Sequence, residues 1–238
     1  MVVRGAAAAG ALVVGLLLAG CAAAPEPAPG KASASAAGEA SGNGRTAGPG
    51  ADAGQGRDGG ERPGAVAAGG VVGAPGSACP LPVTFGLAAG WKPKAVAPPE
   101  GEQEKELFEA LAVQGPVTTA CEIDAKPAGH IGFLRVYVND DASATARATL
   151  EAFVAAETAP SGAVYREVRA GALTATEVTY VTTVELLDQQ KKSRALAVAT
   201  PRGAVVLSLG GMDDAEHEAM LPAFELARST LAPAPAEG

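Results

Sequence analysis

The sequence predicts an α+β domain over residues 78–232, built on an antiparallel sheet of about six strands with helices on one or both faces. Three observations lead to this fold class. The only Trp, all three Tyr and all five Phe lie in this part of the chain, so the core must form there. Segments rich in β-branched residues follow one another across short turns. Helical segments flank them without the strand–helix–strand alternation of a parallel sheet.

The first half of this domain contains three predicted strands and one predicted helix. A short strand covers residues 82–87, and residues 117–123 and 131–138 form a hairpin across the turn residues 126–129. A helix lies between the first strand and this hairpin and ends at Gly115-Pro116. Its apolar positions recur at helical spacing and are Leu107, Phe108, Leu111 and Ala112.

The second half begins with a helix for which Asp140-Asp141 is the predicted N-cap. The apolar face of that helix consists of Ala146, Leu150, Phe153 and Val154. Four strands then follow across short turns, so consecutive strands are expected to pair antiparallel. They cover residues 164–169, 173–187, 193–200 and 204–209. Asp213, with Glu216 three residues later, begins a last helix in the manner of a capping box.

The N-terminus combines Arg4, an apolar run over residues 6–18 and the sequence Leu18-Ala19-Gly20-Cys21. This combination resembles a bacterial lipoprotein signal. The resemblance implies that residues 1–20 are removed and that the Cys21 thiol receives a diacylglycerol. The chain would then be anchored by lipid to the outer face of the cell membrane. The alternative is a transmembrane helix, for which the run is short.

Residues 21–77 contain the expected lipidated N-terminus and a segment of Ala, Gly, Pro and Ser with a few scattered charges. Such a composition has too little bulky apolar surface to offset the entropy cost of ordering the backbone. We therefore expect residues 22–77 to be a disordered tether. The last residues, 233–238, are expected to be a disordered tail.

The net charge of −8 indicates an acidic protein. Nucleic acid is not expected as a partner, because binding phosphates requires clustered Lys and Arg. The densest acidic run is Glu100, Glu102, Glu104, Glu106 and Glu109. We interpret it as the solvated face of the first helix rather than a cation site, because it lacks the spacing and the glycine of a calcium loop. No metal or other cofactor is expected.

Removing Cys21 to lipid leaves two cysteines, Cys79 and Cys121, in an exported chain. We predict that they form a disulfide. Closing a loop of about 42 residues would favour the folded state by about 4 kcal/mol on the chain-entropy model. The alternative, a metal site, would need two further ligands, and His130 and His217 are isolated in the sequence.

No catalytic motif is present in the sequence, and no catalytic residue is assigned. His130 lies at the edge of the predicted hairpin, just after its turn residues 126–129, and is a possible ligand contact. His217 stands among carboxylates at the start of the last helix, where we expect it to be exposed and favoured in its charged form. Trp91 is either a core residue or a platform on which a ligand stacks.

The predicted elements open with a strand containing Phe85, followed by Gly90-Trp91, and close with a meander and a C-terminal helix. This order of elements is similar to that of the Mog1/PsbP-like α/β/α sandwich. Secreted actinobacterial lipoproteins of the LpqN type are thought to share that fold. The Ala/Gly-rich leader and the spacer also look like those of lipoproteins from high-GC Gram-positive bacteria. The resemblance implies a binding or accessory role.

The sequence therefore predicts an extracytoplasmic lipoprotein with a non-catalytic role at the cell envelope. Its expected partner is an envelope component, a small ligand or another exported protein. The alternative is a hydrolase that acts on envelope material, with a site near His130.

Overall fold

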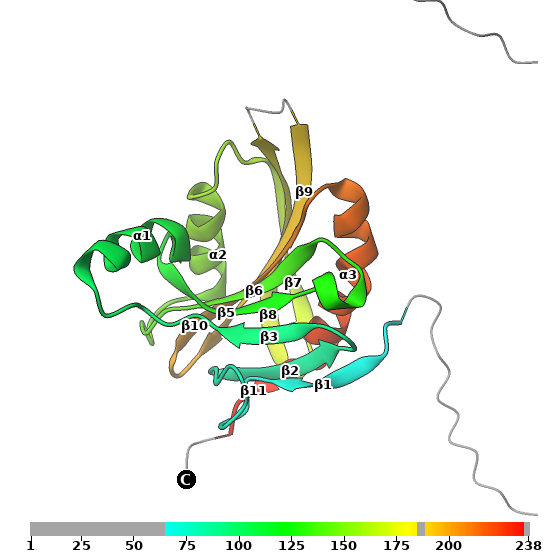
Figure 1. The fold of residues 1–238 in the computed structure, drawn as a ribbon, viewed down its shortest axis with the longest axis horizontal. Helices are drawn as coiled ribbons and strands as arrows, with labels where there is room; N and C mark the ends of the chain where they lie inside the picture. The colour runs from blue at the N-terminus through cyan, green and yellow to red at the C-terminus, as the bar shows by residue number, and fades with distance from the viewer. Residues whose placement is uncertain (1–64, 185–188, 236–238) are drawn as a thin grey trace, which may run out of the picture. The chain divides into compact units, whose positions relative to one another are not determined.

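A computed structural model describes residues 65–184 and 189–235. The proposed lipid site Cys21, residues 1–64, the four residues 185–188 and the last three residues lie outside this description. The described part folds as two antiparallel sheets and three α-helices. Figure 1 shows their arrangement.

The larger sheet has eight strands, in the order β3–β5–β6–β10–β9–β8–β7 with β4 paired to β5. Its strands are β3 (Lys92–Ala95), β4 (Val113–Gln114), β5 (Val117–Asp124), β6 (Gly132–Val138), β7 (Ser161–Ala170), β8 (Leu173–Val184), β9 (Gln189–Thr200) and β10 (Gly203–Gly211). The smaller sheet has the order β1–β2–β11. Its strands are β1 (Ala68–Val72), β2 (Val83–Ala88) and β11 (Ala232–Pro233).

The helices are α1 (Glu102–Ala112), α2 (Ala146–Ala155) and α3 (Asp214–Ser229), and a short 3-10 helix, η1, spans Lys126–Ala128. Helix α2 covers one face of the larger sheet, where Leu150 and Phe153 pack with Val206. Helix α3 and the smaller sheet cover the other face, where Phe224 packs in one cluster with Leu207. Successive residues of β10 point to opposite faces, so Val206 and Leu207 belong to different cores. The mixed α/β fold with an antiparallel sheet is therefore as predicted.

The predicted number of about six strands was too low. The additional strands are short or lie at sheet edges, where their sequences lack the apolar alternation of a half-buried strand. Strand β3 reads Lys-Pro-Lys-Ala and borders the larger sheet next to β5. Proline is tolerated there because one side of an edge strand has no hydrogen-bonding partner to lose.

The boundaries of the folded domain also differ from the prediction. Residues 68–72, expected in the tether, form β1, which pairs with β2 and buries Val72 in the core. At the other end, Pro233, expected in the disordered tail, pairs with Val83 of β2. In both cases the partner strand β2 provides order that the Gly- and Pro-rich segments lack by themselves.

The helix caps agree with the prediction in one case and differ in the other. The Asp213 carboxylate accepts a hydrogen bond from the backbone N–H of Glu216 at 2.9 Å and caps α3, as predicted. The N-cap of α2 is Thr145, whose hydroxyl accepts from the N–H of Ala148 at 3.2 Å. The prediction of Asp140-Asp141 was wrong, because Asp141 instead stabilises a turn by accepting from the N–H of Ser143.

Cys79 and Cys121 are joined by a disulfide, as predicted. Cys79 lies in the loop before β2, and Cys121 is a residue of β5. The disulfide therefore connects the loop before β2, a strand of the smaller sheet, to the larger sheet. Both cysteines are buried in the core between the two sheets.

Candidate functional site

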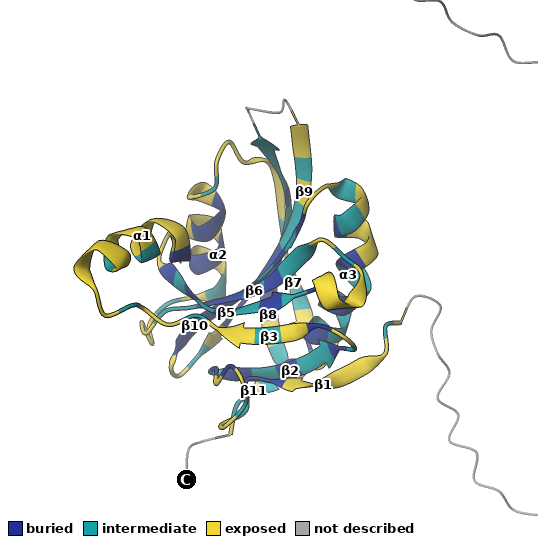
Figure 2. Ribbon diagram, viewed as in Figure 1, coloured by how far each residue is buried: buried dark blue, intermediate teal, exposed yellow. Residues whose placement is uncertain are grey.

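Helix α1 leaves most of its apolar face exposed. Of its eleven residues only Ala112 is buried, whereas Leu107 is 61% exposed and Leu111 is 77% exposed. Figure 2 shows most of α1 as exposed, in contrast to the buried face of α2. Helical spacing identifies which residues share a face, but it does not establish that another element covers that face.

The C-terminal end of α1 is fixed to the larger sheet. The Thr119 hydroxyl of β5 donates a 3.0 Å hydrogen bond to the carbonyl oxygen of Ala112. Directly after the helix, Val113 and Gln114 form β4 and pair with β5. The helix is thus held at one end beside the sheet, with its apolar face toward a gap.

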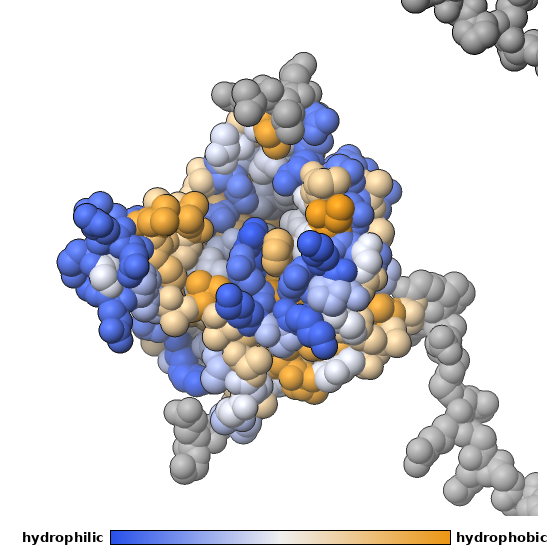
Figure 3. Space-filling view, in the orientation of Figure 1, coloured by the Kyte–Doolittle hydropathy of each residue, from blue (hydrophilic) through white to orange (hydrophobic). Residues whose placement is uncertain are grey.

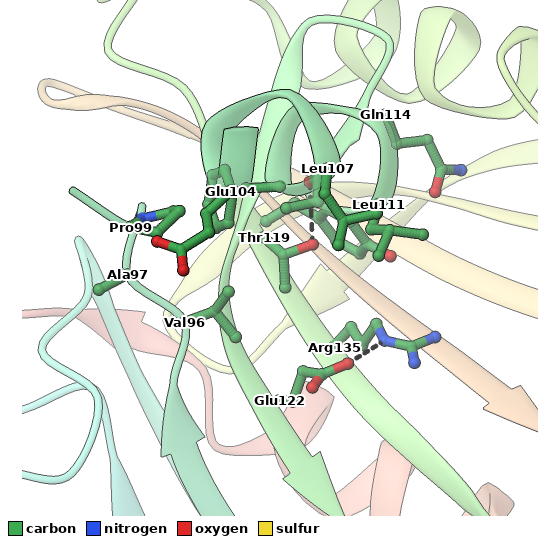
Figure 4. Close-up of a pocket in the computed structure, with 13 residues that line it drawn as sticks. Val96, Ala97, Pro99, Glu104, Leu107, Leu111, Gln114, Thr119, Glu122 and Arg135 are labelled. Carbon is green, nitrogen blue, oxygen red and sulfur yellow. Dashed lines mark hydrogen bonds and ion pairs between the residues drawn. The ribbon is translucent and has the colours of Figure 1, made fainter. Parts of the chain in front are cut away.

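This gap is a cavity of about 700 Å³ between α1, the segment that follows β3, and strands β5 and β6. We call it the α1 cleft. Its apolar lining consists of Val96, Ala97, Pro99, Leu107, Phe108, Leu111 and Ala112, and its polar lining consists of Glu104, Gln114, Thr119, Glu122, Arg135 and Tyr137. Figure 4 shows Leu107 and Leu111 on the helix above Thr119, with Glu122 and Arg135 on the strands below.

The floor of the α1 cleft contains a charged pair. Arg135 Nε donates a 2.7 Å hydrogen bond to Glu122 Oε1, and both side chains are partly exposed. The Arg135 guanidinium also lies over the ring of Phe133, 4.9 Å from its centroid. Burial raises the pKa of the nearby Tyr137 hydroxyl above its ordinary value, and the Arg135 guanidinium acts in the opposite direction.

A smaller polar cavity of about 190 Å³ adjoins the α1 cleft and shares Gln114, Arg135 and Tyr137 with it. Glu157 organises this end. Its Oε1 atom accepts hydrogen bonds from the Tyr180 hydroxyl at 2.9 Å and from Gln114 Nε2 at 3.0 Å. Burial is the main cause of the raised pKa of Tyr180, and the adjacent Glu157 raises it further. The combined cavity therefore changes from apolar beneath α1 to polar beside α2.

The surface around α1 has two contrasting sides. In Figure 3 the outer side of the helix, at the left of the view, is strongly hydrophilic, and an apolar patch lies directly inside it. Four glutamates of α1 are exposed, and helical spacing places Glu102, Glu106 and Glu109 away from the leucines, whereas Glu104 lines the cleft. The prediction that the acidic run is a solvated helix face is confirmed.

Trp91 is not available to a ligand, because its side chain is only 3% exposed and belongs to the main core. The turn before it accounts for this position. Gly90 has a φ of 83°, which favours glycine, and the Trp91 N–H donates to the Ala88 carbonyl at 3.2 Å. The interpretation of Trp91 as a ligand contact was therefore wrong, and its core interpretation holds.

His130 follows η1 at the surface, away from the α1 cleft. Its Nδ1 atom lies 3.6 Å from Glu216 Oε2 of α3, and its side chain is about one-third exposed. The same Glu216 oxygen accepts a hydrogen bond from the N–H of Ile131 at 3.1 Å. The structure thus places a carboxylate beside His130 in a contact that also attaches the 126–131 turn to α3.

His217 contradicts the expectation of an exposed, charged side chain. It is 4% exposed, and burial is the main cause of its lowered pKa. The first turn of α3 lies close to β10: a Cβ atom on Gly211 would come within 2.6 Å of the backbone nitrogen of His217. The neighbouring carboxylates of Asp214 and Glu218 raise its pKa by less than burial lowers it. The described residues contain no cluster of three or more His, Cys, Asp or Glu arranged to hold a metal ion.

Comparison with known proteins identifies the family. A family model described as an uncharacterised lipoprotein matches residues 49–231, which is most of the chain. The chain belongs to this lipoprotein family. The match begins after Cys21, so the lipid site itself stays a prediction, while family membership indicates association with a membrane. No helix within the described segments is both long and apolar enough to span one.

Among solved structures, the lipoprotein is similar to the solution structure of cyanobacterial PsbP (CyanoP) from Synechocystis sp. PCC 6803. The similarity covers 64% of this chain and 86% of that chain, with 14% sequence identity and a TM-score of 0.43. No curated protein matches the lipoprotein.

Sequence reasoning did not find the α1 cleft. The nearest signal in the sequence is the acidic run that leads into Leu107-Phe108. The apolar positions of α1 have the spacing of an ordinary core-facing helix, so their pattern does not indicate that the face is left exposed.

Proposed function

We propose that the lipoprotein is anchored to the outer face of the cell membrane through a lipid on Cys21 and that its folded domain has a non-catalytic binding role. The α1 cleft is the proposed binding site. The observation that supports this most directly is the exposure of Leu107 and Leu111 above a cavity of about 700 Å³. Exposed apolar patches beside a cavity are a common feature of binding sites.

The energetics favour occupation of the cleft by an apolar group. Covering a leucine side chain fully is worth about 1.5–3 kcal/mol, and both leucines still expose most of their surface. The cavity is open toward solvent beside these residues, so the free protein does not gain the free energy of covering the two leucines. A bound apolar group would recover part of it without a rearrangement of the core.

The polar groups of the cleft support binding rather than catalysis. Glu122 is paired with Arg135, and Glu157 accepts from both Gln114 and Tyr180. Carboxylates engaged in this way are suited to orient a ligand or to position neighbouring donors. His130, the residue on which the hydrolase alternative depends, lies beside α3 and outside this cleft.

An apolar fluorescent probe tests the proposed site. The chain from residue 21 onward, with Cys21→Ser so that no lipid is attached, should bind Nile red with increased fluorescence. Leu107→Ser/Leu111→Ser should weaken that binding about tenfold, because the probe loses roughly 1.4 kcal/mol of apolar contact. Val164→Ser is the matched control, since Val164 is an equally exposed residue of β7. Equal binding by the double variant and the control would refute the site.

A further inference from the structure

We infer that a second cavity, between α3 and the sheet, binds a small carboxylate with an apolar body through the side chains of Arg194 and His217. We call it the α3 cavity. It has a volume of about 350 Å³, and its lining includes His217 and Leu221 of α3, Val181 of β8 and Arg194 of β9. It shares no lining residue with the α1 cleft, so the inference does not depend on the proposed binding role.

The place of the α3 cavity follows from how α3 is packed. The helix lies beside β9, as Figure 1 shows, and His217 stands in its first turns. Val181 and Leu221 give the cavity an apolar wall. Small-molecule sites commonly combine such a wall with a few polar groups that fix the orientation of the ligand.

Two buried nitrogen atoms of this lining have no hydrogen-bonding partner. They are Nδ1 of His217 and Nε of Arg194, and across residues 65–184 and 189–235 no other buried side-chain nitrogen or oxygen lacks a partner. His217 is 4% exposed, and the Arg194 side chain is 15% exposed. Buried polar groups are nearly always hydrogen-bonded, so two exceptions in the lining of one cavity indicate that their partner binds there.

The chemistry of the two nitrogens specifies a hydrogen-bond acceptor. Arg194 Nε always carries a proton and can only donate, and His217 Nδ1 donates in one neutral tautomer and in the charged form. A carboxylate has two acceptor oxygens and no donor, so it brings no N–H or O–H group that would itself need a partner in an apolar cavity. Both nitrogens are covered in the free protein, so binding involves side-chain rotation, and the terminal torsion of histidine is broad enough to allow it.

The ion pairs around Arg194 favour an anion. Arg194 Nη2 lies 2.9 Å from Glu177 Oε2 and 2.8 Å from Glu225 Oε1, which leaves Nε free for another acceptor. Arg166 and Arg228 pair with the same two carboxylates. Three guanidinium groups therefore share two carboxylates, and a ligand carboxylate would balance the remaining positive charge.

The carboxylate on the rim of the α3 cavity acts in the opposite direction. Glu218 lines the cavity and pairs with Lys192, which also contacts Asp214. The side chains of Asp214 and Glu218 are 46% and 59% exposed, so water screens their charges more strongly than those of the buried network. Removing the charge of Glu218 should therefore strengthen the binding of an anion.

Nitrogen-15 nuclear magnetic resonance of the histidines tests the inference with 4-fluorobenzoate as the probe. The chain contains two histidines, so His130, which lies outside the α3 cavity, is an internal reference. Adding 4-fluorobenzoate to the Cys21→Ser chain should shift the imidazole resonances of His217 in a saturable manner and leave those of His130 unchanged. The neutral isostere 4-fluorobenzamide should bind at least about tenfold more weakly, because hydrogen bonds between charged groups are the stronger ones.

Variants that block the cavity or remove the imidazole locate the site. Val181→Phe should fill the cavity and abolish the shifts of His217, whereas Val71→Phe, at a 62% exposed valine of β1, is the matched control and should not. His217→Phe keeps a ring but has no nitrogen, so fluorine-19 resonance should report binding of 4-fluorobenzoate weakened at least about fivefold.

A charge variant tests the electrostatic argument. Glu218→Gln should strengthen binding of 4-fluorobenzoate about threefold, because it removes the carboxylate from the rim and the main counter-charge of Lys192. Glu109→Gln, at an exposed glutamate of α1, is the control and should change nothing.

Three outcomes would overturn the inference. They are equal binding of the acid and the amide, binding by Val181→Phe as tight as that of the parent, and resonances of His217 that do not move up to about 10 mM probe. The last result would show that water alone pairs with the two nitrogens. Nile red binding at the α1 cleft should be unaffected by Val181→Phe, so failure of this inference is distinguishable from failure of the proposed function.

Discussion

Arg194 donates a 2.9 Å hydrogen bond from Nη2 to Oε2 of Glu177, a carboxylate that is only 1% exposed. The other carboxylate oxygen of Glu177 accepts from Arg166 Nε at 3.0 Å. Arg194 also pairs with Glu225 of α3 at 2.8 Å. This network connects β7, β8, β9 and α3, and it is the most deeply buried charged group on the α3 side of the larger sheet.

Glu177→Ala should therefore destabilise the fold by about 3 kcal/mol, because it removes the buried carboxylate that Arg166 and Arg194 share and leaves Glu225 as the remaining counter-charge of the largely buried Arg194. Urea unfolding followed by far-ultraviolet circular dichroism measures the change. Glu167→Ala, an exposed glutamate of the adjacent strand β7, is the matched control and should change stability by less than about 0.5 kcal/mol. Equal effects of the two substitutions would show that the network does not stabilise the fold.

His217 should make the stability of the domain depend on pH. Burial lowers its pKa in the folded state, with Arg194 and Lys192 acting in the same direction and Asp214 and Glu218 opposing it. Above the unfolded pKa of about 6.5 the side chain is neutral in both states and has no effect. As the pH falls below this value, the unfolded chain binds a proton that the folded protein resists, so stability is lost.

His217→Gln should remove part of this loss. The difference in urea midpoint between pH 7.5 and pH 5.5 should be smaller in the variant than in the parent, whatever the absolute stability of the variant. Ser229→Ala is the control, because Ser229 is an exposed residue of the same helix and neither side chain gains or loses a proton in this pH range. An identical loss in the parent and in His217→Gln would contradict the lowered pKa of His217.

Cys21 is expected to hold the lipid that anchors the chain. Cys21→Ser should leave an uncleaved or shed protein, because a hydroxyl does not replace the thiol that is alkylated. Metabolic labelling with an azido fatty acid followed by detection of the tagged protein measures this. The two acyl chains of a diacylglycerol are needed for stable attachment, since a single chain binds membranes only weakly. Equal labelling of the parent and the variant would refute the lipid site.

His130→Ala separates the binding role from the hydrolase alternative. A binding protein should keep its stability and its Nile red binding, because His130 lies outside the α1 cleft. If His130 is instead a general acid or base, any hydrolytic activity on envelope material should fall at least about 100-fold while stability is unchanged. Nile red binding and hydrolytic activity, each measured on the parent and on His130→Ala, decide between these outcomes.

Strands with clear apolar alternation were predictable from the sequence. Residues of β5 alternate between buried and intermediate exposure along Val117–Asp124, and this strand, β6 and the strands β8–β10 lie where the sequence indicated. Strand β1 was missed because its sequence, Ala-Gly-Gly-Val-Val, has few side chains that form a pattern. It is ordered by backbone pairing with β2, which depends on a partner distant in the sequence.

The candidate site was predictable only in its components. The helical spacing of Leu107 and Leu111 predicted that they share a face, and the glutamates predicted a solvated face. Whether the apolar face is covered depends on how α1 is attached at Ala112 and β4, which is tertiary information. His217 was misjudged for the same reason: its burial results from the packing of the first turn of α3 close to β10, which its charged neighbours in the sequence do not indicate.

The most direct test of the proposed binding role is a methyl nuclear magnetic resonance titration of the Cys21→Ser chain, labelled at Leu and Val methyl groups, with Nile red. The binding account predicts shift changes concentrated at Val96, Leu107, Leu111 and Val113, with little change at Val164 on β7. Saturation of these shifts at one equivalent of Nile red would establish a single site at the α1 cleft. Changes centred on β7 or α3, or no changes at any Nile red concentration, would contradict the account.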